Sequence, residues 1–280
     1  FCSIPTPRSI RIALARMLYS QKNCLALTFW SKAGYKTLKT YGNITSGSLL
    51  EKSEVVYPAI RFVDASVKVS RSSNVNILFS GDFFRKGGAN VVDAFEILQE
   101  KYPGIMLTIC SDEEIDFITQ DIEMKNHYLL KIKNNPRIRF GRIARKEMLE
   151  SVLPNTDIFL IPTYNEAFGY AILEAMAYGL PVVATNIFAI PEIVEINETG
   201  FMINVEDYDM EKLFSGYIVN HIPDSLLGHI TNQLKDHLQV LIEDASLRVK
   251  FGAAGQEVAR TKFSFENRNN RMLQIYRSAF

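Results

Sequence analysis

The sequence predicts an α/β fold in which helices cover both faces of a parallel β-sheet. From Asn76 onward, short apolar runs of strand type alternate with stretches of helical pattern, as in sheets built from right-handed βαβ units. The 280 residues are 47% hydrophobic, which suffices for the core of one large domain or two small ones. The expected strands are residues 76–80, 106–110, 138–140, 158–161, 181–184 and 200–203.

The residues before this sheet predict part of a second α/β domain, because they hold too few elements for a complete one. We expect an amphipathic helix at 8–20, strands at 24–29 and 55–60, and a helix at 32–41. Residues 63–74 contain four serines and few large apolar side chains, which is typical of a linker. Since the chain begins at Phe1, without Met or a signal peptide, we expect a fragment that lacks its beginning.

The residues after the last expected strand predict helices only. Apolar side chains recur with a period near 3.6 over 209–219, 224–243 and 245–260, and residues 263–280 predict a final helix. Asp224 follows Pro223 and is the expected N-cap of its helix. The chain is therefore divided into 1–62, the linker 63–74, the main domain 75–262 and the C-terminal helix 263–280.

The composition excludes several classes of protein. The 31 basic and 31 acidic residues balance, which argues against a nucleic-acid partner. Cys2, Cys24 and Cys110 form neither a disulfide framework nor a metal cluster, so a reducing, cytoplasmic setting is expected. No apolar run approaches the ~20 residues of a membrane span. The basic helix at 8–20 leaves peripheral membrane contact through the first domain open beside an ordinary solvated face.

The stretch 164–185 carries the chemistry, because it predicts a loop at the carboxyl end of a strand followed by a helix. Gly169 allows a ligand to approach the backbone closely. The amides of Gly169, Tyr170 and Ala171 at the helix start, with the positive end of its dipole, suit a phosphate. Glu174 could then reach the ribose hydroxyls of a nucleotide, and Glu166 could accept hydrogen bonds from a second polyol.

This stretch also carries a family resemblance. Glu166 and Glu174 form an E-x7-E pair within NEAFGYAILEAMAYGLPVVAT, which resembles the signature of the retaining group 1 glycosyltransferases, a GT-B family that includes relatives of glycogen synthase and sucrose synthase. The likeness covers roughly residues 76–203, with a weaker echo in the C-terminal stretch FSFENRNNRMLQIY. It implies a Rossmann-like domain for the nucleotide-sugar donor at 75–262, part of an acceptor-side domain at 1–62, and a C-terminal helix that crosses back to the latter.

The resemblance implies transfer of a sugar from a nucleoside diphosphate sugar to an acceptor hydroxyl, with retention of configuration. The acceptor would be a glycan, a lipid-linked molecule or a small molecule. Glu166 and Lys86 would be catalytic, with Lys86 and Gly87 in the loop SGDFFRKGG beside the diphosphate. The family's arginine in this loop is absent, because Asp82 follows Gly81, and Arg85 is the substitute that the loop offers.

The remaining donor-binding residues follow two other expected strands. The resemblance places the nucleotide base at the loop of Arg142 and Ile143, and Ser111 occupies another position at a strand's carboxyl end. Phe188 and Ala189 replace glycines common in the family, which we expect to narrow the donor-sugar pocket.

No metal or cofactor is expected. The four histidines show no metal-binding spacing, and the family generally works without a metal.

Three other functions compete with this interpretation. A glycoside hydrolase fits poorly, since eight residues of a helix rise ~12 Å, whereas hydrolase carboxylates face one another at about 5 to 9.5 Å. A sugar-nucleotide epimerase on the same fold is disfavoured by the sequence EAMAYGLPVVAT. A non-catalytic nucleotide-sugar binding module stays open, because the diphosphate arginine is absent.

Overall fold

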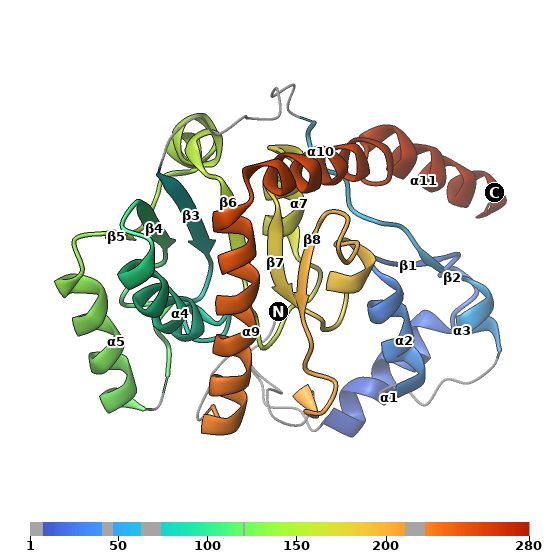
Figure 1. Ribbon diagram of the computed structural model, residues 1–280. Coiled ribbons are helices and arrows are strands. Elements are labelled where there is room, and N and C mark those ends of the chain that lie inside the picture. Colours follow the sequence, from blue (N-terminus) through green and yellow to red (C-terminus); the bar gives the residue numbers. More distant parts are fainter. Residues whose placement is uncertain (1–7, 41–46, 63–73, 120, 211–221, 280) are drawn as a thin grey trace. The chain divides into compact units, whose positions relative to one another are not determined.

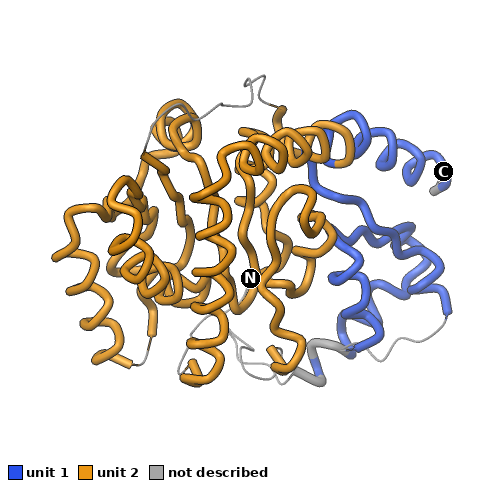
Figure 2. The backbone as a smooth tube through the Cα atoms, viewed as in Figure 1, with its two compact units in different colours: residues 1–59, 263–280 blue, residues 60–262 orange. Residues whose placement is uncertain are grey.

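The computed structural model describes residues 8–40, 47–62, 74–119, 121–210 and 222–279. The chain divides into two compact units, which Figure 2 shows in different colours. Unit 1 comprises residues 1–59 and 263–280, and unit 2 comprises residues 60–262.

Unit 2 is built on a six-stranded sheet in which every pair of neighbours is parallel (Figure 1). The spatial order is β5-β4-β3-β6-β7-β8. This confirms the predicted parallel sheet. The strands are β3 (Val75–Ser80), β4 (Ile105–Cys110), β5 (Ile138–Gly141), β6 (Ile158–Ile161), β7 (Val182–Thr185) and β8 (Gly200–Ile203).

Helices cover both faces of this sheet, also as predicted. On one face, α9 packs against α4, and on the other α10 packs against α7 (Figure 1). A short helix, α6, continues into a π-helical turn, Met148–Val152, and a 3-10 turn, Leu153–Asn155. The main helices are α4 (Gly88–Lys101), α5 (Ile122–Asn134), α6 (Arg145–Glu147), α7 (Tyr170–Ala177), α9 (Asp224–Glu243) and α10 (Ala245–Thr261).

The direction in which strands are added reverses at one point of the sheet. From β3 the chain adds β4 and β5 on one side, and it then returns to add β6, β7 and β8 on the other. Open α/β sheets bind ligands beside such a reversal, at the carboxyl ends of the strands. The reversal lies between β3 and β6, so the loops after Ser80 and after Ile161 border it.

Aromatic packing anchors the first of these loops. Phe83 and Phe84 are fully buried although both lie in the loop. The Phe83 ring stacks on Phe117 with centroids 3.9 Å apart and planes 9° apart, and Tyr128 borders the same cluster. Burying one such side chain contributes about 1.5–3 kcal/mol. The loop that carries Lys86 is therefore held by the hydrophobic core.

Unit 1 contains a two-stranded parallel sheet of β1 and β2. The C-terminal segment of this unit, residues 263–280, contacts its N-terminal segment in two places. Arg271 forms an ion pair with Glu54, and the Phe263 ring makes an edge-to-face contact with Tyr57 at 5.5 Å. Its elements are α1 (Arg8–Tyr19), β1 (Leu27–Phe29), α2 (Lys32–Thr40), α3 (Ser48–Glu51), β2 (Ser53–Val55) and α11 (Phe265–Ala279).

Some predicted boundaries were wrong. The second strand of unit 1 ends at Val55 and does not run over 55–60, because Pro58 has no N–H for a ladder, although Val56, Ala59 and Ile60 are buried. Only the last three residues of the expected strand 24–29 pair with a neighbour. Pro223, not Asp224, is the N-cap of α9, and Asp224 is the first helical residue.

Two predicted segments lie largely outside the described residues. They are the linker 63–74, of which only residue 74 is described, and the helix 209–219, of which only residues 209 and 210 are described. Among the helices that the structure describes, none combines the length and the apolarity that crossing a membrane requires.

Candidate functional site

The predicted site residues lie on loops that leave four adjacent strands at their carboxyl ends. Arg85, Lys86 and Gly87 follow β3, Ser111 follows β4, and Arg142 and Ile143 follow β5. The loop after β6 carries Glu166 and Gly169, and it leads into α7 with Tyr170, Ala171 and Glu174. Since carboxyl ends of parallel strands share one edge, the topology gathers all of these residues there.

Lys86 and Glu166 meet across the point where the strand order reverses. The Lys86 Nζ lies 2.7 Å from Glu166 Oε2, and it also donates to the carbonyl oxygen of Asn165 at 2.9 Å. Each side chain of the ion pair is 13% exposed. Burial lowers the pKa of the Lys86 ammonium below its usual value, and the Glu166 carboxylate partly offsets this effect. The structure thus places a partly desolvated cation where a nearby anion is strongly favoured.

The second oxygen of Glu166 is held by its own loop. Glu166 Oε1 accepts hydrogen bonds from the amides of Ala167 at 2.9 Å and Phe168 at 3.3 Å. Together with the bond from Lys86, these contacts fix the rotation of the carboxylate. An acceptor fixed in this way can select the hydroxyl geometry of a ligand.

Gly87 allows the two loops to come this close. Its φ is +81°, a left-handed conformation that suits glycine, and it is the N-cap of α4. A Cβ at this position would lie 2.1 Å from the carbonyl oxygen of Pro162 in the loop after β6. Any side chain here would therefore push apart the loops that bring Lys86 and Glu166 together.

A buried polar network supports the loop after β6. Tyr164 is fully buried and its hydroxyl donates to Asn90 Oδ1 at 2.5 Å, while Asn90 Nδ2 donates to Leu227 O at 2.9 Å and Thr231 Oγ1 at 3.0 Å. Burial raises the pKa of Tyr164, so the hydroxyl stays a neutral donor. Sequence reasoning missed Asn90, whose signal is a single amide within an otherwise apolar helix start.

Arg85 is engaged within its own loop. Its Nε lies 3.3 Å from Asp82 Oδ2, and the two side chains are 23% and 12% exposed. Burial raises the pKa of Asp82, and the charge of Arg85 acts against that shift. Arg85 therefore follows the expectation that it lies beside Lys86, but its side chain is paired with Asp82, the residue found where the family has an arginine.

The amino end of α7 has the predicted form. Gly169 is its N-cap with a φ of +107°, and the amides of Tyr170 and Ala171 open the helix. Gly169 is buried, Ala171 is half-buried and the Tyr170 side chain is 41% exposed. The positive end of the helix dipole thus lies at the same sheet edge as Lys86 and favours an anion there.

Glu174 has a partner that sequence reasoning missed. Arg145, the first residue of α6, forms a forked ion pair with it, in which Nη1 donates to Oε2 at 2.8 Å and Nη2 donates to Oε1. The Glu174 side chain is 16% exposed and that of Arg145 is 63% exposed. A usable signal was present, because Arg145 and Lys146 place two cations at a helix start, where the dipole disfavours them.

Arg142 and Ser111 also have protein partners. Arg142 is 66% exposed and pairs with Asp112, whose pKa is held below its usual range mainly by the amides of Ile115 and Glu114. The buried Ser111 hydroxyl donates to the carbonyl oxygen of Gly81 and ties the loop after β4 to the loop after β3. Ile143 is half-buried beside Arg142. Contact of these residues with a nucleotide stays a prediction.

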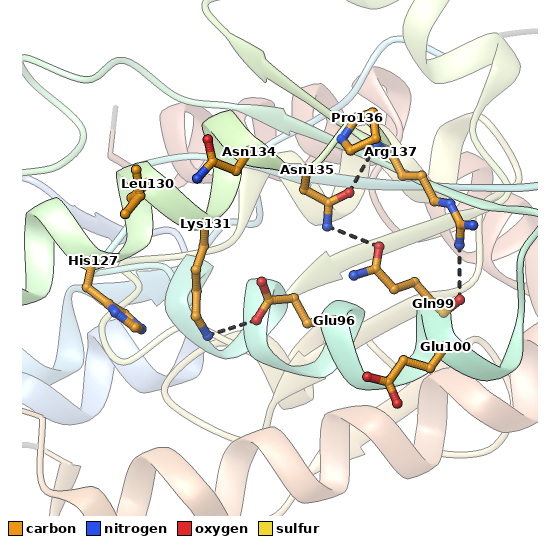
Figure 3. Close-up of a pocket in the computed structure, with 10 residues that line it drawn as sticks. All are labelled: Glu96, Gln99, Glu100, His127, Leu130, Lys131, Asn134, Asn135, Pro136 and Arg137. Atoms are coloured by element: carbon orange, nitrogen blue, oxygen red, sulfur yellow. Dashed lines mark hydrogen bonds and ion pairs between the residues drawn. The ribbon is translucent and has the colours of Figure 1, made fainter.

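A separate pocket of ≈ 700 Å³ lies between α4 and α5 (Figure 3). Its polar groups pair with one another: Lys131 Nζ lies 2.8 Å from Glu96 Oε2, and Arg137 donates to Gln99 O at 3.0 Å. Because its lining includes the residues just before β5, it belongs to the amino edge of the sheet. It is therefore distinct from the candidate site.

A metal centre finds no support in the residues that the structure describes. Within them, His, Cys, Asp and Glu side chains form no group of three or more that could hold a metal ion.

Comparisons with known proteins identify the family of the chain. Residues 74–216, just over half of the chain, match the sequence model of the family described as glycosyl transferases group 1. A 41.2 kDa protein from the cps region of Klebsiella pneumoniae is 26% identical over 97% of this chain, which spans 66% of that protein. The D-inositol 3-phosphate glycosyltransferase of Corynebacterium efficiens is 27% identical over 69% of this chain, which spans 40% of that enzyme.

A solved structure shows the same fold. Anabaena HepE, in complex with UDP and glucose, superposes with a TM-score of 0.68 at 17% identity, over 98% of this chain and 68% of HepE.

Proposed function

The chain belongs to the group 1 glycosyl transferases, whose solved relatives share its GT-B fold, and on this premise we propose that it transfers a sugar from a nucleoside diphosphate sugar to an acceptor hydroxyl with retention of configuration. The observation that carries the proposal is the Lys86 and Glu166 ion pair at the reversal point of the sheet. It joins a cation suited to a diphosphate with a carboxylate suited to sugar hydroxyls.

In this proposal the leaving diphosphate is stabilised by two groups. Lys86 provides a charge whose burial makes an added anion favourable, and the amino end of α7 at Gly169 provides the positive end of a dipole. Donors aimed at a developing charge are each worth about 2.7–4 kcal/mol of transition-state stabilisation. Arg85 lies in the same turn as Lys86 and is the proposed second cation, if the diphosphate competes with Asp82 for it.

The two carboxylates are assigned to opposite ends of the donor. Glu166 is proposed to orient the transferred sugar, because both of its oxygens are already held in fixed positions. Glu174 is proposed to accept hydrogen bonds from the ribose hydroxyls, one helical turn beyond the diphosphate site. Arg142, Ile143 and the loop after β5 are proposed to border the base.

The proposed reaction needs no protein nucleophile. The bond between the sugar C1 and the diphosphate oxygen breaks with its electrons going to that oxygen. The acceptor oxygen bonds to C1 from the same face, and its proton passes to the departing diphosphate. Positioning and charge stabilisation then account for the rate.

Product release from the full chain tests the proposal. A thermal-shift panel of UDP-, ADP- and GDP-sugars first identifies the donor, since a ligand of the folded state raises the melting temperature. UDP-glucose comes first, because HepE holds UDP and glucose. Release of nucleoside diphosphate is then measured with and without glycan and small-molecule acceptors.

The outcomes separate the alternatives. Turnover that requires an acceptor supports the transferase. Interconversion of the sugar without an acceptor would identify an epimerase, and tight binding without any product would identify a binding module. Failure of every nucleotide sugar to bind would contradict the assignment of the site.

Variants test the two carboxylates separately. We expect Glu174→Ala to weaken nucleotide binding, and Glu166→Ala to lower turnover with little change in nucleotide affinity. Glu257→Ala, which removes an exposed carboxylate paired with Arg260 on α10, is the matched control. Unchanged affinity and rate in both site variants would refute both roles.

A further inference from the structure

Arg145 is paired with Glu174, the carboxylate that we propose binds the ribose of the donor. It forms the forked contact with Glu174 described above, with one N–H on each carboxylate oxygen. Resting on that proposed function, we propose that Arg145 is a positioning residue, which holds the Glu174 carboxylate in the orientation that receives the two ribose hydroxyls of the donor.

The geometry leaves the carboxylate able to bind while it is held. A planar guanidinium that bonds both oxygens fixes the rotation of the carboxylate about its last torsion. Each carboxylate oxygen has two acceptor positions, so one on each oxygen is left for a hydroxyl. At 16% exposure, Glu174 is accessible from the sheet edge without being free in solvent.

Both partners lie on elements that are fixed to one another. α7 buries Ile172, Leu173 and Met176 in the core. Tyr178, the C-cap residue of α7, donates its hydroxyl to the carbonyl oxygen of Leu149 at 2.8 Å, in the turn that continues α6. The forked pair therefore joins two elements that already have a defined spacing.

Stability alone does not account for this pair. Ion pairs with a partner as exposed as Arg145 typically add little to folding, and forked arginine–carboxylate pairs such as this one lie at the favourable end of that range. The residue also begins a helix, where its charge opposes the dipole. A role in orienting Glu174 explains why the cation lies there.

The test measures how strongly the site distinguishes a ribose diol. Dissociation constants are determined by calorimetry for UDP, ADP and GDP and for their 2′,3′-dideoxy forms, with the wild type, Arg145→Gln and Arg145→Lys. For the nucleotide that binds, loss of the diol should weaken wild-type binding about 10- to 100-fold. In Arg145→Gln this ratio should fall to about 3-fold or less, with the affinity for the dideoxy form unchanged. Arg145→Lys should give an intermediate ratio, because an ammonium cannot form the fork.

Arg139→Gln is the matched control. Arg139 lies on β5, pairs with Glu147 at 2.5 Å and is 54% exposed, and its replacement should leave the diol ratio at the wild-type value. Melting curves show whether each variant is folded. A purely structural role for Arg145 would weaken the binding of both forms equally and overturn the proposal.

Other outcomes also decide it. An unchanged ratio in Arg145→Gln overturns the proposal, as does tighter binding of the ribonucleotide, which would show that Arg145 competes with the ribose. Equal wild-type affinity for the two forms overturns it while leaving the transferase assignment standing. Absence of any nucleotide binding to the wild type overturns both.

Discussion

Lys86 and Glu166, 80 residues apart in the chain, form an ion pair of 2.7 Å between the loops that follow β3 and β6. Their strands are neighbours at the reversal of the sheet order, so the contact depends on the topology. The pair lies where this fold class binds nucleotides, and it links the residue proposed to stabilise the leaving group to the residue proposed to orient the sugar.

Replacing Lys86 by Ala should lower kcat/KM about 10²- to 10³-fold, since one donor to the developing charge is lost. It should also lower the free energy of unfolding by about 1–3 kcal/mol, because Glu166 stays largely buried without its cation. Steady-state kinetics and urea denaturation measure the two effects. Lys101→Ala, which breaks an exposed pair with Glu243, should change neither. Normal turnover in Lys86→Ala would rule out its role in leaving-group stabilisation.

Replacing Gly87 by Ala should destabilise the protein by more than the ~1–2 kcal/mol that the left-handed backbone alone costs a non-glycine residue. The added Cβ would also meet Pro162 O at 2.1 Å. The control is Gly228→Ala in α9, where a Cβ meets nothing within 4 Å. That change should stabilise the protein by about 0.5–1 kcal/mol through helix propensity. Thermal melts of the two variants should therefore shift in opposite directions, and shifts of equal sign would contradict the close approach of the loops.

Replacing Phe83 by Ala should cost about 3–5 kcal/mol of folding free energy, because a fully buried ring is lost from a packed cluster. Since this ring anchors the loop of Lys86, nucleotide affinity should fall as well. Ile97→Ala on α4 removes a side chain that is 50% exposed and should stay within about 0.5 kcal/mol of the wild type. Denaturation and calorimetry provide both measurements. If Phe83→Ala lowered the folding free energy no more than Ile97→Ala does, the loop would not be anchored by its aromatic residue.

His237 should make stability depend on pH. Its ring stacks on Phe201 at 4.7 Å, and burial lowers its pKa below the ordinary value of about 6.5. The unfolded chain then binds a proton more readily than the folded protein, so this contribution to stability is present above pH 6.5 and is lost as the pH falls through the lower folded pKa. The melting temperature of His237→Gln should therefore fall less than that of the wild type between pH 7.5 and 5. Parallel curves would contradict the shift.

The class of fold and the elements with strong local patterns could be predicted from the sequence. Strands 158–161 and 200–203 and helix 224–243 were predicted to the residue, because strands buried on both faces are continuous apolar runs and long helices carry a clear period. The start of α7 after Gly169 was predicted for the same reason, since glycine and the following helix formers mark it locally.

Which side chains meet could not be predicted and depends on the three-dimensional fold. Lys86 with Glu166, Tyr164 with Asn90 and Arg145 with Glu174 are separated by 80, 74 and 29 residues. Each contact depends on which strands are neighbours and on how far each loop rises above the sheet edge, and no local pattern contains either. Likewise Pro58 and the pairing of β1 with β2, not the run of apolar residues, set where the strand of unit 1 ends. Local sequence patterns therefore specify the individual helices and strands, and the order of the strands in the sheet specifies which side chains come into contact.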